Sequence, residues 1–79
     1  MLPQINVPET GKQIKSIMQS KGLSVKDIQR ACEFTTPQAV YKWINGKNIP
    51  TVDNLVIVAS LLGCRINDIV VVERSYYGG

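Results

Sequence analysis

The 79-residue chain contains no histidine and only two cysteines, Cys32 and Cys64. A zinc site needs about four ligands, usually thiolates and imidazoles, so two thiols cannot close one. Histidine is also the commonest general acid or base, and neither cysteine has a base beside it. The sequence therefore predicts no enzyme, no metal site and no cofactor. We expect both cysteines to be small buried residues rather than a disulfide.

Long apolar runs are absent as well. No stretch approaches the roughly 18 apolar residues that cross a bilayer, and the first residues lack the pattern of a secretory signal. The sequence therefore predicts a cytoplasmic protein without a membrane partner, and it shows no pattern that indicates a small-molecule ligand. A chain of 79 residues has room for one small domain.

Positive charge is concentrated in the middle of the chain. Residues 10–48 contain seven lysines and arginines against two acids, whereas residues 49–79 contain two arginines against three acids. A domain with one basic part is suited to a polyanion such as a nucleic acid. Lysines that only solvate helices explain the same distribution equally well, so charge alone leaves both interpretations open.

The first predicted helix covers residues 8–21 and follows an extended arm, residues 1–7, that contains a proline. Its apolar residues fall on one helical face. Gly22 provides a C-terminal stop. Gly11 inside the segment costs about 1 kcal/mol of helix propensity relative to alanine.

A second helix is predicted from Ser24 to about Glu33. Ser24 and Asp27 have the spacing of a capping box, in which two side chains bond each other's backbone N–H groups. A new start signal follows at once, because Thr36 precedes Pro37 and a hydroxyl before proline suits a helix cap. Thr35 remains an alternative cap. The two helices are therefore joined by a tight turn.

The third predicted helix, from Pro37 to Asn45, carries two stripes on opposite sides. The apolar stripe consists of Val40, Trp43 and Ile44. The other stripe contains no acid and is rich in hydrogen-bond donors: Gln38, Tyr41, Lys42 and Asn45. A helix that reads base edges needs an apolar back and such a front. An ordinary amphipathic surface helix meets the same description, so the pattern alone does not decide between them.

Two further elements are predicted in the last third of the chain. Thr51 caps a fourth helix that ends at Gly63. Residues 66–71 form a short fifth helix. An extended segment is the alternative, because β-branched residues dominate there. Residues 73–79 form a C-terminal tail.

Several of these features together resemble the lambda-repressor-like (Cro/Xre-type) helix-turn-helix family over residues 8–72. The residues that carry the resemblance are Gly22, Leu23, Ser24, Phe34, Pro37, Gln38, Ala39, Val40, Tyr41, Lys42, Trp43, Asn45, Gly46, Lys47, Pro50, Asp53, Asn54, Leu55, Ala59, Leu62 and Gly63. The resemblance implies an all-α, compact five-helix domain with flexible termini, whose second and third helices form the DNA-reading pair. It also implies a sequence-specific regulator of transcription that binds double-stranded DNA, in particular a repressor.

The resemblance implies two sets of DNA contacts. The base-contacting residues are Pro37, Gln38 and Lys42. The backbone-contacting residues are Ser24, Lys26, Thr36, Tyr41, Asn45 and Lys47. An amide such as that of Gln38 can pair with adenine through two hydrogen bonds, and a lysine can reach guanine. Tyr41 has a second interpretation, as a half-buried support for Trp43.

The chain departs from the family pattern at three places. Val25 stands where members often carry a phosphate-binding glutamine, so Ser24 or Lys26 must supply that contact. The turn at residues 33–36 is one residue longer than the commonest pattern, which leaves the register of the third helix open by one residue. Met18 and Ile44 occupy positions where many members pair an arginine with a glutamate, and we expect packing to replace the pair.

An alternative function is an antitoxin-like or adaptor module that uses the same fold against a protein. It is suggested by apolar residues near the C-terminus that lack a clear place in the core: Val70, Val71, Val72, Tyr76 and Tyr77. Exposed, they would form a dimer interface or add a strand to a partner. A homodimer would also serve DNA binding, because paired reading helices lie about 34 Å apart on two half-sites.

Overall fold

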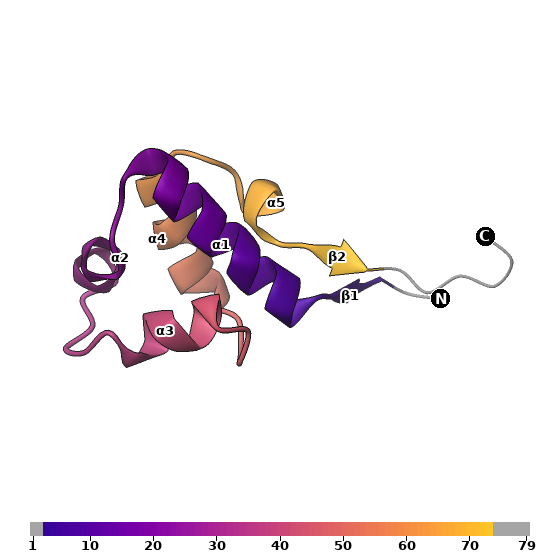
Figure 1. Cartoon of the computed structure of the whole chain (residues 1–79), viewed down its shortest axis with the longest axis horizontal. Helices are drawn as coiled ribbons and strands as arrows, with labels where there is room; N and C mark the ends of the chain where they lie inside the picture. The colour runs from indigo at the N-terminus through magenta and orange to yellow at the C-terminus, as the bar shows by residue number, and fades with distance from the viewer. Residues whose placement is uncertain (1–2, 74–79) are drawn as a thin grey trace, which may run out of the picture.

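The computed structural model describes residues 3–73, and within them five helices pack around one core (Figure 1). The elements are, in order, β1 (Gln4–Ile5), α1 (Val7–Lys21), α2 (Val25–Ala31), α3 (Gln38–Ile44), α4 (Val52–Leu62), α5 (Ile66–Ile69) and β2 (Val72–Glu73). The predicted five-helix, all-α fold is confirmed, with one small sheet added where residues 4–5 meet residues 72–73. Within the described part of the chain, no helix is long and apolar enough to cross a bilayer.

The ends of the longer helices follow local sequence signals. The Asn6 side chain accepts a hydrogen bond from the Glu9 N–H at 3.0 Å, so α1 begins one residue earlier than the sequence predicted. Thr51 caps α4 as predicted. Gly22 and Gly63 end α1 and α4 with φ angles of 69° and 68°, in the left-handed region that glycine adopts without a steric cost.

The core lies where the helices cross, with α4 behind α1 in Figure 1 and α3 along the lower edge. Its buried hydrophobic residues are Ile14, Met18, Ile28, Val40, Trp43, Leu55, Val58, Ala59, Leu62 and Ile69. Ile44 packs against this cluster. The positions where family members often place an ion pair, Met18 and Ile44, are therefore filled by apolar packing, as expected.

Cys32 and Cys64 are free, and both are half-buried against the core rather than fully buried as expected. Burial raises the pKa of both thiols, which favours the protonated form. Among residues 3–73, no three His, Cys, Asp or Glu residues are grouped in a way that would hold a metal ion.

The two ends of the described chain pair with each other, which the sequence did not predict. In the antiparallel sheet, Gln4 lies opposite Glu73 and Ile5 opposite Val72. Part of the expected N-terminal arm is thus a strand, and the region after residue 65 contains both predicted forms, a four-residue helix and then an extended segment. Val70 packs against the core, whereas Val72 pairs in the sheet but keeps 47% of its surface exposed. Tyr76 and Tyr77 lie outside the described residues.

Candidate nucleic-acid interface

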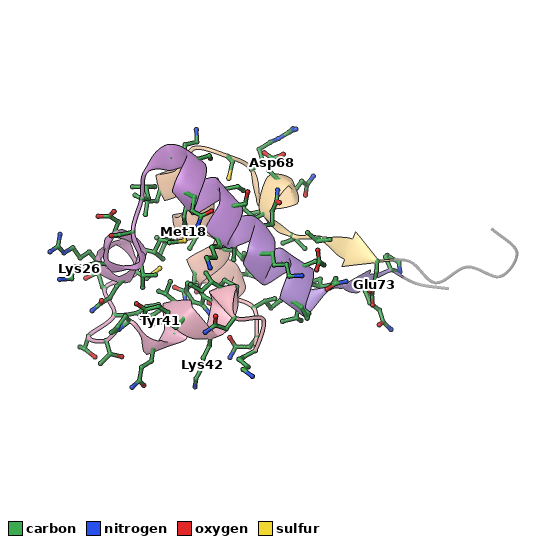
Figure 2. All side chains as sticks on the ribbon, viewed as in Figure 1. Met18, Lys26, Tyr41, Lys42, Asp68 and Glu73 are labelled. Carbon is green, nitrogen blue, oxygen red and sulfur yellow. The ribbon has the colours of Figure 1, made fainter. Side chains whose placement is uncertain are left out.

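The two stripes of α3 point as the sequence predicted. Val40 and Trp43 are buried, with 0% and 4% of their surface exposed. All residues of the donor-rich stripe are exposed: Gln38, Tyr41, Lys42 and Asn45. In Figure 1, α3 lies at the edge of the molecule, and Figure 2 shows Lys42 extending from it away from the other helices. No acid occurs between residues 34 and 52, so this surface combines amides and cations without a neighbouring carboxylate from the same segment.

Trp43 fixes the inner side of α3 to the turn that precedes it. The Phe34 and Trp43 rings meet edge to face, with centroids 5.7 Å apart and planes inclined by 64°. This geometry is favourable because the positive edge of one ring faces the negative face of the other. Phe34 is thus an aromatic support of Trp43, whereas Tyr41 has 48% of its surface exposed.

The turn between α2 and α3 is held by Gln29, which sequence reasoning missed. The Gln29 side-chain amide donates to the Phe34 carbonyl at 3.2 Å, and the Phe34 N–H donates to the Gln29 carbonyl at 3.0 Å. Glu33 sits between them with a φ of 58°, a conformation that is uncommon outside glycine. These bonds tie Phe34 to the last turn of α2 and so hold the first half of the turn that leads to α3.

The predicted hydroxyl cap of α3 is wrong. The helix begins at Gln38 with Pro37 at the N-cap position, and no side-chain hydrogen bond caps it. The reason lies in the backbone of Pro37: with φ −83° and ψ 1° it is already close to helical, and its carbonyl accepts from the Tyr41 N–H at 3.1 Å. Thr36 therefore lies outside the first turn, and it is exposed.

The start of α2 contains the predicted capping box. The Ser24 N–H donates to a carboxylate oxygen of Asp27 at 2.8 Å, and the Asp27 N–H donates to the Ser24 hydroxyl at 3.3 Å. The same hydroxyl lies 3.1 Å from the Asp27 carboxylate and donates to it. Ser24 is thus already engaged, whereas Lys26 is exposed and extends from α2 into solvent in Figure 2.

The capping box makes stability depend on pH. Hydrogen bonds from the Ser24 N–H, and next from the Ser24 hydroxyl, hold the pKa of Asp27 below its ordinary value. A carboxyl with a lowered folded-state pKa stabilises the fold above its unfolded pKa, and this contribution is lost as the pH falls through the folded-state pKa. We expect Asp27→Asn to be less stable than the unmodified protein at neutral pH and to lose this difference in acid. Denaturant unfolding between about pH 7 and pH 2 measures it. A difference that stays constant with pH would contradict the role given to the carboxylate.

The end of α3 brings the remaining predicted contacts together. Asn45 is the C-cap residue and is exposed. The chain reverses at Gly46, and the Lys47 N–H donates to the Lys42 carbonyl at 2.9 Å. Lys47 is exposed as well, so this end of the helix presents two lysines and an amide to solvent.

A family model described as helix-turn-helix, the Cro/C1 type, matches residues 14–69, which include α2, the turn and α3. The chain belongs to the helix-turn-helix family. The resemblance noted in the sequence is thereby confirmed, and the helix-turn-helix corresponds to α2 and α3.

Three solved structures share this helix-turn-helix fold. The restriction-modification controller protein C.AhdI from Aeromonas hydrophila aligns with a TM-score of 0.71 and 16% identity, over 80% of this chain and 94% of that one. The clp gene regulator ClgR from C. glutamicum aligns with a TM-score of 0.71 and 18% identity, over 84% of each chain. The DNA-binding domain of BldD aligns with a TM-score of 0.67 and 18% identity, over 82% of this chain and 93% of that one. A search of curated protein sequences found no match.

Proposed function

We propose that this helix-turn-helix protein is a sequence-specific regulator of transcription that inserts α3 into the major groove of double-stranded DNA. The proposal depends on the exposed, acid-free stripe of α3. The opposite, apolar side of the helix is held in the core by Trp43 and Val40. A firmly packed α3 matters because hydrogen bonds to base edges tolerate little displacement of the helix. The proposal is supported by similar structures described as a controller protein, a gene regulator and a DNA-binding domain.

Base recognition falls to the first turns of α3. Gln38 is the first residue of the helix, and its amide offers one donor and one acceptor, the pair that adenine presents in the major groove. Lys42 lies one turn further along the same stripe and suits the two acceptors of guanine. Pro37, half-buried at the N-cap, contributes an apolar contact at the groove edge.

Contacts to the DNA backbone come partly from this stripe and partly from the residues around it. Lys26, Thr36, Tyr41, Asn45 and Lys47 are all exposed. Lysines attract phosphates by charge, and hydroxyl or amide groups donate to phosphate oxygens, which fixes the position of the protein on the duplex. The Ser24 hydroxyl could donate to a phosphate only if it gave up its hydrogen bond to Asp27. Lys26 therefore supplies the stronger phosphate contact at the start of α2.

Selection of bound duplexes from a random oligonucleotide pool tests the proposal. We expect a discrete motif to be enriched over successive rounds. The absence of an enriched motif, together with capture of a protein partner, would support the adaptor alternative instead. Footprinting of the enriched duplex also tests the number of copies bound: we propose a homodimer, which protects two half-sites about 34 Å apart.

Repression is the regulatory mode that we propose. Occupation of an operator that overlaps a promoter is sufficient to block transcription, whereas activation needs a further contact with the polymerase. A reporter gene placed behind the enriched motif should lose expression when the protein is produced. An increase in expression would contradict repression and indicate activation, and the proposal of DNA binding would still stand.

Lys47→Ala should weaken binding to all duplexes to a similar extent. Because a phosphate contact releases counterions, we expect the slope of log affinity against log salt to fall by about one. The measurement is a salt titration of affinity for the enriched duplex and for an unrelated one. Arg65→Ala removes the same charge next to α5, which lies across α1 from α3 in Figure 1, and should leave the slope unchanged. Equal slopes for Lys47→Ala and the unmodified protein would remove Lys47 from the interface.

A further inference from the structure

The backbones of α1 and α3 approach each other closely at Gly11. A side-chain carbon added there would lie 3.1 Å from the Ile44 carbonyl oxygen and 3.2 Å from the Gly46 nitrogen. It would lie closer still to the carbonyl oxygen of Trp43. All three atoms belong to the backbone at the end of α3, so no side-chain rotation can make room. Only glycine permits this approach.

A second close contact lies one turn earlier on α1. A side-chain carbon at Gly46 would lie 2.8 Å from the Cα atom of Pro8. Because Pro8 and Gly11 are three residues apart, they share one face of α1. The first turns of α1 thus contact the end of α3 and the turn that follows it, through backbone atoms at Gly11 and through the backbone and rigid ring of Pro8.

The start of α1 is itself tied to the other end of the fold by a terminal clasp, which consists of Asn6, Thr10, Val71 and Glu73. Thr10 is 1% exposed, and its hydroxyl accepts from the Val71 N–H at 3.0 Å. The Asn6 N–H donates to the Val71 carbonyl at 2.8 Å, and the Asn6 side chain donates to Glu73 at 2.9 Å. Figure 1 shows β1 and β2 side by side next to the first turn of α1.

From these contacts we infer that Gly11 is a positioning residue for DNA recognition. The terminal clasp holds the first turns of α1 in place, and Gly11 then sets the position and tilt of α3. The inference rests on the proposed function. Base-edge hydrogen bonds need donor and acceptor about 2.7–3.2 Å apart, whereas attraction between lysines and phosphates persists over longer distances. A displaced α3 therefore loses discrimination between sequences before it loses attraction to DNA.

The test compares Gly11→Ala with Ser16→Ala, an exposed position on the same helix. Alanine favours a helix over both residues, so helix propensity alone predicts no loss in either variant. We expect Gly11→Ala to bind the enriched duplex about tenfold or more weakly, and an unrelated duplex less than about threefold more weakly. Ser16→Ala should change neither affinity. Unchanged affinity, or an equal loss on both duplexes, in folded Gly11→Ala would overturn the inference.

Amide chemical shifts provide the second readout. In Gly11→Ala they should change along α3 and the following turn, at positions such as Trp43 and Gly46. If Gly11→Ala does not fold, Thr10→Val opens the clasp with a side chain of similar shape, and the same shifts and the same loss of discrimination are expected. Unchanged α3 shifts in Thr10→Val would then refute the inference. Failure of the proposed function is distinguishable, because in that case the unmodified protein itself enriches no duplex.

Discussion

Trp43→Ala is expected to leave the domain unfolded or nearly so at physiological temperature. Removal of a buried aromatic side chain costs about 3–5 kcal/mol, through lost apolar burial and the cavity left behind. At roughly 0.05–0.15 kcal/mol per residue, a domain of 79 residues has an unfolding free energy of about 4–12 kcal/mol, so the loss is a large part of the total. Trp43 is 4% exposed and lies at the junction of α3 with the core and with Phe34.

Thermal unfolding followed by far-UV circular dichroism measures this effect, because Trp43 is the only tryptophan and its fluorescence is lost in the variant. We expect the midpoint to fall by at least about 12 °C. Tyr41→Ala is the matched control: it removes an aromatic ring from the same helix at a position that is 48% exposed, and should cost less than about 1 kcal/mol. A cooperative transition of Trp43→Ala at the original temperature would place this side chain outside the core.

The part of the fold that the sequence predicted well is the part whose signals are local. The Ser24 and Asp27 capping box needs only a spacing of three residues, and the two stripes of α3 need only the helical period. Both signals come from residues within about two turns of one another, so no knowledge of the tertiary structure is required. The orientation of the Gln38 side of α3 towards solvent follows directly from them.

What the sequence did not predict depends on contacts between distant segments. The strands that join the chain ends are two residues long, too short to show an alternating pattern, and Asn6 and Glu73 are 67 positions apart. Gly11 looked like a local defect in a helix, because its benefit lies in the approach of α3, which no local signal records. The Thr36 cap failed for a subtler reason: the backbone of Pro37 continues into the helix.

Gln38→Ala is the most specific test of base recognition by the exposed stripe of α3. Loss of the paired hydrogen bonds to one base should cost about 1–3 kcal/mol on the enriched duplex and relax the preference at one position of the motif. Unrelated duplexes should be bound as before, because they are held through phosphate contacts that Gln38 does not make. Affinity measurements against duplexes that carry each of the four base pairs at every motif position would locate the affected position.

Gln19→Ala controls for the general effect of replacing an exposed helical glutamine, since Gln19 lies on α1 outside the proposed interface. It should leave both affinity and base preference unchanged. A uniform loss across all duplexes in Gln38→Ala would mean that Gln38 contacts the DNA backbone rather than a base. In that case α3 would lie on the duplex in a register shifted by one residue or at a different tilt. The contact between α3 and α1 at Gly11 sets that tilt.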